Sequence, residues 1–183
     1  MQGRRDIPLS DRGRAQARAW RLPADFDRAG VTWYSSPLRR ATETAELLGA
    51  DAVELDAALT EMSWGDWEGF TLAELRETHG DMYVRNEARG LDFCAPRGES
   101  PRDVLERLKP WLARVGASDV PVIAVTHLGV IRAIVAAATG WDMTGKAPVK
   151  LRSDVLHRVN IDAEGRIAID EWNVPLIYRA DGA

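Results

Sequence analysis

Apolar and polar positions alternate between strand-like and helix-like patterns along the chain. Residues 31–34 are β-branched and aromatic, and they run into Ser35-Ser36-Pro37, which is typical of a strand that ends where a helix begins. Residues 121–126 form a continuous apolar run of the kind that a buried parallel strand needs. A turn follows, and residues 130–139 then read as a helix closed by Gly140.

The strongest helical pattern lies between Ser100 and Gly116. Ser100-Pro101 is a typical helix start, apolar residues recur at helical spacing, and Gly116 is a typical stop. Gly65 and Gly69 mark an irregular loop between weaker elements. The other predicted elements are helices over 11–20, 37–48, 71–78 and 81–88, a strand over 52–55, and a hairpin of 155–161 and 166–171.

Strands that alternate with helices predict an α/β fold, and we expect a three-layer α/β/α sandwich with a mostly parallel sheet. The length of 183 residues fits a single domain that spans residues 1–183. In open sheets of this kind, ligands bind beyond the carboxyl ends of the strands. Residues that follow predicted strands are therefore the first candidates for a site.

Composition narrows the possible partners. Lysine and arginine total 24 against 28 acidic residues, a net charge of −4, which argues against nucleic acid and anionic membrane surfaces as partners. The single Cys94 excludes an internal disulfide and a multi-cysteine zinc site. There is no apolar run long enough to span a membrane and no apolar signal-peptide core at the N-terminus, so we expect a cytoplasmic protein.

Three ionisable residues follow predicted strands. Arg40 falls in the first turn of its helix, where a guanidinium can bind an anion, although an arginine there is more often solvated. His127 follows the most apolar strand and can donate to a phosphoryl oxygen, although such a histidine is structural about as often. Glu61 lies beside aromatic residues that can raise a carboxyl pKa, although an exposed loop glutamate is the simpler interpretation.

Taken together, several segments resemble the histidine phosphatase superfamily, the group that includes phosphoglycerate mutases, broad-specificity phosphatases and α-ribazole phosphatases. The likeness extends over nearly the whole chain, and the segments occur in the family's order. They are Gln2 to Ser10 with Gly13, Ser35-Ser36-Pro37-Leu38 with Arg40-Ala41, Glu61 with Trp67-Glu68-Gly69, Gly98-Glu99-Ser100, and Thr126 to Arg132, in which Leu128 replaces the usual glycine.

The resemblance implies phosphoryl transfer through a phosphohistidine. Arg40 would hold the phosphoryl group, His127 would stabilise it during transfer, and Glu61 would donate the proton to the leaving group. The implied partner is a small phosphorylated metabolite, with no cofactor and no metal. The residues that would contact the substrate are Gln2, Gly3, Arg4, Trp64 and Leu128.

The family's nucleophilic histidine is missing from the sequence. It would lie in an Arg-His-Gly motif at the end of a first, central strand, and neither is present. His79 and His157 read as structural residues near a helix end and inside a strand. We therefore expect that the printed chain lacks the first central strand, is inactive and folds poorly, and that the natural protein begins upstream of Met1.

Three functions stay open. A phosphomonoesterase of the broad-specificity or α-ribazole type is preferred. A cofactor-dependent phosphoglycerate mutase is less favoured, because the segment between Gly69 and Gly98 is short and lacks the adjacent arginines and the lysine with which mutases hold a bisphosphate. A non-catalytic relative could bind a phosphorylated ligand through Arg40 and His127. The sequence does not indicate the oligomeric state.

Overall fold

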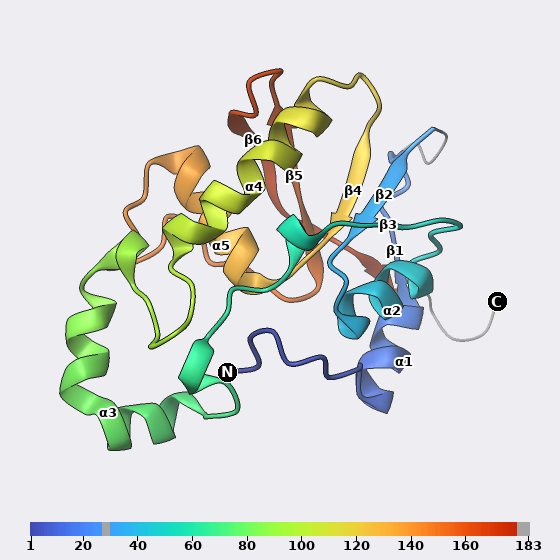
Figure 1. Cartoon of the computed structure of the whole chain (residues 1–183). Helices are drawn as coiled ribbons and strands as arrows, with labels where there is room; N and C mark the ends of the chain where they lie inside the picture. The colour runs from blue at the N-terminus through green and yellow to red at the C-terminus, as the bar shows by residue number, and fades with distance from the viewer. Residues whose placement is uncertain (27–29, 179–183) are drawn as a thin grey trace.

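The computed structural model describes residues 1–26 and 30–178 and has an α/β architecture (Figure 1). The helices are α1 (Asp11–Ala19), α2 (Arg39–Leu47), α3 (Leu72–Glu87), α4 (Pro101–Gly116) and α5 (Leu128–Thr139), with short 3₁₀ helices η1 (Ala57–Leu59), η2 (Gly65–Trp67) and η3 (Gly90–Asp92). The strands are β1 (Trp20–Arg21), β2 (Thr32–Ser35), β3 (Glu54–Leu55), β4 (Val122–Val125), β5 (Val155–Ile161), β6 (Ile167–Pro175) and β7 (Ile177–Tyr178).

The parallel part of the fold is a three-stranded sheet in the order β3-β2-β4. Ser35 pairs with Leu55 on one side and with Val125 on the other, so the three strands end at the same level. The predicted parallel α/β sheet is confirmed. Its carboxyl edge brings the segments after residues 35, 55 and 125 together.

The remaining strands form separate pairs. β5 and β6 make an antiparallel hairpin with a register shift near Arg158, and β1 pairs antiparallel with β7. Within residues 1–26 and 30–178, no backbone ladder joins β4 to β5. β4 and β5 therefore belong to two separate sheets, and each has one edge without a strand partner in the described part of the chain.

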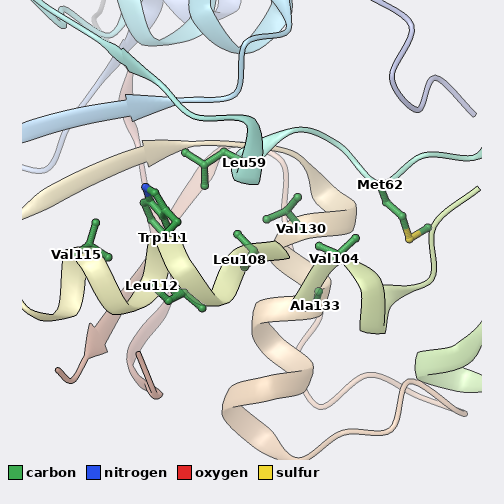
Figure 2. Close-up of a cluster of buried hydrophobic side chains, with 9 residues drawn as sticks. All are labelled: Leu59, Met62, Val104, Leu108, Trp111, Leu112, Val115, Val130 and Ala133. Carbon is green, nitrogen blue, oxygen red and sulfur yellow. The ribbon is translucent and has the colours of Figure 1, made fainter. Parts of the chain in front are cut away.

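Helices α4 and α5 pack against each other and against the β5-β6 hairpin, while α2 packs against β2 and β4. The largest apolar cluster of the described residues lies between α4, α5 and η1, with Trp111 and Leu108 of α4 on the side of Leu59 and Val130 (Figure 2). The buried members of this cluster are Leu59, Met62, Val104, Leu108, Trp111, Leu112, Val115, Val130 and Ala133.

Local signals set the boundaries of most helices. The Ser100 hydroxyl accepts from the Asp103 N–H, and the Asp103 carboxylate accepts from the Ser100 N–H, a capping box that begins α4 as predicted. The two helices expected between residues 71 and 88 are one element, α3, interrupted by a non-helical backbone at His79. The His79 ring stacks on Trp67 at 6.2 Å between centroids.

Some details differ from the prediction. α2 begins at Arg39 and not at Pro37, because Leu38 keeps an extended backbone with φ −69° and ψ 132°. The two-residue strands β1 and β7 and the short helix η3 were not predicted, since so few residues carry no periodic signal. β4 was expected to be buried, yet Ala124 is exposed and its neighbours are half-buried.

None of the helices in the described residues has the length and apolar character needed to cross a membrane.

Candidate active site

Backbone hydrogen bonds bring the strand ends to one point. The Ser36 N–H donates to the Val125 carbonyl at 3.0 Å, and the Asp56 N–H donates to the Ser35 carbonyl at 3.0 Å. The Thr126 hydroxyl then donates to the Leu59 carbonyl at 2.7 Å. The loop that carries Glu61 is therefore held across the ends of β2 and β4.

Arg40 lies in the first turn of α2, as the sequence indicated. Its guanidinium donates to the Arg5 carbonyl and to the Gly3 carbonyl, each at 2.8 Å, and so fixes the N-terminal loop beside the strand ends. Partial burial lowers the pKa of Arg40, while the carboxylates of Glu61, Asp6 and Glu68 raise it. A guanidinium remains charged under these conditions and can bind an anion.

His127 is the residue immediately before α5 and is 8% exposed. Its Nε2 atom lies 2.7 Å from the Ser36 hydroxyl oxygen. Burial, followed by the positive charges of Arg40 and Arg107, lowers the pKa of His127 to about 3. The ring is therefore neutral at pH 7, with one nitrogen that donates and one that accepts.

Glu61 lies just after η1 and faces the start of α5. Its carboxylate accepts from the Met62 N–H at 2.8 Å and from the Gly129 N–H at 3.1 Å. Burial raises the pKa of Glu61 above its ordinary value, although these two hydrogen bonds and the charges of Arg40 and Arg107 lower it in part. A raised pKa favours the protonated form of the carboxyl group, which is the form that can donate a proton.

The three candidate residues are brought together at the carboxyl edge of the sheet. Glu61 is bonded to the backbone two residues after His127, and Arg40 acts electrostatically on both of them. The set combines a cation, a neutral hydrogen-bond donor and a proton-donating carboxyl. Such a set can hold a phosphoryl group and protonate a leaving oxygen.

The structure also places the five residues predicted to contact substrate. Gly3 is buried with φ +53° and supplies a carbonyl to Arg40, whereas Gln2 is exposed. The Arg4 guanidinium donates to Glu99 at 2.6 Å. Trp64 packs edge-on against Phe93 at 5.5 Å, and Leu128, the first residue of α5, is 59% exposed.

The sequence interpretation missed Arg107 and the role of Glu99. Glu99 binds both Arg4 and Arg107, and Arg107 also donates to the carbonyls of Ala58 and Thr60. These residues surround an open pocket of about 390 Å³, lined by Arg4, Ala57, Ala58, Thr60 and Arg107. The helical pattern placed Arg107 on α4 but gave no sign of its partners, which come from segments distant in sequence.

The other two histidines have structural contacts away from this edge. His79 stacks on Trp67. In β5, His157 accepts from the Asn173 N–H at 3.2 Å and packs edge-on against Trp172, and burial lowers its pKa. Among the residues that the structure describes, there is no group of three or more histidine, cysteine, aspartate or glutamate side chains that could hold a metal ion.

The chain thus has a parallel α/β sheet with an arginine, a histidine and a glutamate at its carboxyl edge. Residues 1–175 match the histidine phosphatase superfamily (branch 1), and the chain belongs to this family. The resemblance drawn from the sequence motifs is therefore confirmed.

Individual relatives include both phosphatases and a mutase. Glucosyl-3-phosphoglycerate phosphatase of Mycolicibacterium vanbaalenii is 37% identical over 164 residues, covering 79% of this chain and 71% of the relative. A 2,3-bisphosphoglycerate-dependent phosphoglycerate mutase of Methylobacterium radiotolerans is 32% identical, covering 87% and 82%. The chain is similar to each of them without being shown to share its substrate.

Solved structures agree on the fold. A mycobacterial glucosyl-3-phosphoglycerate phosphatase in complex with inorganic phosphate superposes with a TM-score of 0.76 and 30% identity, covering 96% of this chain and 91% of the relative. The α-ribazole phosphatase of Shigella flexneri gives a TM-score of 0.74 over 99% of this chain and 91% of its own, at 22% identity. At 22% identity, the likeness to the α-ribazole phosphatase shows only that the two chains share a fold.

Proposed function

We propose that the carboxyl edge of the sheet is the phosphoryl-binding part of a phosphomonoesterase that acts through a phosphohistidine. The observation that carries the proposal is the convergence of Arg40, His127 and Glu61 from three separate segments. Arg40 binds the phosphoryl oxygens, His127 donates to the group in transfer, and Glu61 protonates the leaving oxygen. Family membership supports this assignment, since the matched relatives include phosphatases.

The raised pKa of Glu61 gives it a specific role. Phosphoryl transfer from an alkyl ester creates a basic oxygen that leaves more readily when it is protonated. Glu61 accepts from the N–H of Met62, its neighbour in the chain, and from the N–H of Gly129 in the first turn of α5, so its position is fixed before substrate binds. Arg40 instead contributes charge, which acts on the phosphoryl group whatever the leaving group is.

The phosphoryl acceptor is the part that the described residues do not supply. His127 is bonded to Ser36 and belongs to the binding half of the site, while His79 and His157 pack against aromatic rings elsewhere. We propose that a strand carrying the acceptor histidine pairs between β4 and β5, which belong to separate sheets. A strand there, parallel to β4, would end beside His127.

A small phosphorylated metabolite is the proposed substrate, with Gln2, Gly3, Arg4, Trp64 and Leu128 facing its non-reacting part. Hydrolysis is favoured over mutase activity by the segment between Gly69 and Gly98. It contains no lysine and no adjacent arginines with which a bisphosphate could be retained. A phosphatase needs only to admit water to the phosphohistidine.

Binding is tested first, with inorganic phosphate and the printed chain by isothermal titration calorimetry. Arg40→Ala should weaken phosphate binding at least about tenfold, as expected for the loss of a charged hydrogen-bond donor. Arg39→Ala is the matched control, because the Arg39 side chain is 59% exposed and forms a long ion pair with Glu43 at 3.8 Å. Equal losses in the two variants would contradict the assignment of Arg40.

Catalysis is tested in a chain extended ahead of Met1 by a flexible linker and an apolar strand that ends in Arg-His-Gly. The extension should confer phosphatase activity. In that protein, Glu61→Gln should slow the hydrolysis of an alkyl phosphate about 10²–10⁴-fold, and it should slow the hydrolysis of nitrophenyl phosphate far less. Glu54→Gln, on exposed β3, is the control. Equal losses for both esters would remove the acid role, and phosphate binding without turnover would favour the non-catalytic relative.

A further inference from the structure

The contact between His127 and Ser36 is buried and short. Ser36 is 0% exposed and His127 is 8% exposed, and the two side chains come from positions 91 residues apart. The distance from His127 Nε2 to Ser36 Oγ is 2.7 Å, within the range of a good hydrogen bond. One of these groups donates and the other accepts, and the choice decides which ring nitrogen carries the proton.

The hydrogen bonds around Ser36 decide the direction. A serine hydroxyl has one proton to donate and two lone pairs that accept. Ser36 Oγ already accepts from the Leu38 N–H at 3.3 Å. Among the described residues, His127 Nε2 is the only acceptor within reach of the Ser36 hydroxyl proton.

The two possible tautomers therefore differ in cost. If Nε2 carried the proton, Ser36 Oγ would accept twice and its own proton would be buried without a partner, which is unfavourable. If Nε2 is unprotonated, the Ser36 hydroxyl donates to it, and both atoms of this contact have a partner. The neutral ring then carries its proton on Nδ1, which has no hydrogen bond within the described residues.

We propose that Ser36 is a positioning residue that fixes His127 as the Nδ1–H tautomer and so presents the Nδ1–H group to the phosphoryl oxygens. The last step rests on the proposed function, whereas the tautomer does not. Ser35, the last residue of β2, and Ser36, which follows it, therefore have different roles. Ser35 donates to the Ser36 carbonyl at 2.9 Å and stabilises the turn, and Ser36 orients the imidazole.

The tautomer is measured on the printed chain by ¹⁵N-detected NMR of the histidine rings at pH 7. We expect His127 to show a protonated, pyrrole-type Nδ1 and an unprotonated, pyridine-type Nε2. Ser36→Ala should remove this preference and produce the Nε2–H tautomer or a mixture. Ser35→Ala, equally buried and one residue away, should leave it unchanged, and Ser36→Thr, which keeps a hydroxyl, should restore it.

The unsubstituted chain alone can overturn the proposal, because a proton on Nε2 would refute it whether or not any variant folds. An unchanged tautomer in Ser36→Ala would refute it as well. Inorganic phosphate provides the functional readout, and Ser36→Ala should weaken its binding about tenfold while Ser35→Ala does not. If the tautomer follows the prediction but phosphate does not bind to the unsubstituted chain, the proposed function fails and the positioning of His127 stands.

Discussion

Helix α4 and strand β4 both carry a set of apolar residues, yet only the apolar face of the helix is buried. In α4, Val104 and Leu108 are fully buried and Trp111 is 4% exposed. In β4, Ala124 is exposed, and the remaining residues are only half-buried. The helix has α5 and η1 packed against its apolar face, whereas β4 has a strand neighbour on one edge only within residues 1–26 and 30–178. Burial therefore depends on the neighbours that an element finds, and apolar sequence alone does not ensure it.

A substitution in the buried face of α4 should lower the free energy of unfolding more than any of the other changes below. Trp111→Ala removes a large side chain between η1 and Val115 in the cluster of Figure 2, and it should lower the free energy of unfolding by about 3–5 kcal/mol. Urea denaturation followed by circular dichroism measures the change. Leu105→Ala, half-buried on the same helix, should cost clearly less. Similar losses would mean that the apolar face of α4 is not buried as described.

The second effect is a dependence of the free energy of unfolding on pH, caused by His127, which lies two residues after the end of β4. The pKa of His127 is about 3 in the folded chain against an ordinary value of 6.5. As pH falls from 6.5 toward 3, the unfolded chain takes up a proton at this histidine that the folded chain does not, so the free energy of unfolding falls by roughly 4 kcal/mol. The raised pKa of Glu61 opposes this just above pH 4.5, where the folded chain holds the extra proton.

The comparison with His127→Asn isolates the histidine. Denaturation midpoints between pH 3 and pH 8 should fall less steeply in this variant than in the unsubstituted chain. Parallel curves would show that His127 is accessible to protons and that its end of β4 is as open as Ala124.

A smaller effect tests the start of α4. Ser100→Ala removes the hydroxyl of the capping box, which accepts from Asp103 N–H at 3.1 Å and donates to the Asp103 carboxylate at 2.7 Å. The loss should be about 1 kcal/mol by urea denaturation, the usual value for such a cap. Thr71→Ala provides the counterpart on α3, whose cap is more exposed, and it should cost less.

The smallest effect is expected on β4 itself. Ala124→Ser adds a hydroxyl at an exposed position and should change the free energy of unfolding by less than about 0.5 kcal/mol. A central, covered strand would suffer more, because the hydroxyl would be desolvated. A loss above about 1 kcal/mol would show that β4 is covered in solution, and it would remove the contrast with α4.

The sequence predicted the α/β class and most of the elements, because their signals are local. Ser100 and Asp103 form the expected cap, and the apolar run at 121–126 does form a strand. The predicted convergence of Arg40, Glu61 and His127 also depends on a general rule, that parallel strands deliver their last residues to one edge. Their catalytic roles stay a prediction.

What could not be predicted depends on contacts between distant segments. The apolar spacing of α4 predicted the helix that contains Arg107. It did not predict that the Arg107 guanidinium binds backbone carbonyls some fifty residues earlier in the chain. The sequence placed Ser36 at the end of a strand, and only its contact with His127 in the structure indicates that it positions the imidazole. The exposure of β4 likewise follows from the pairing of whole strands, which no window of sequence contains.

The hydrogen bonds from Arg40 to the N-terminal loop leave some side chains of that loop free to vary. Arg40 binds the carbonyl oxygens of Gly3 and Arg5, which every amino acid possesses, and makes no use of the side chains there. Gly3 is constrained by its φ of +53°, and Arg4 by its ion pair with Glu99. Gln2 and Arg5 can therefore be exchanged as a small library beside Arg40, with the path of the loop kept and Arg40, Glu61 and His127 unchanged.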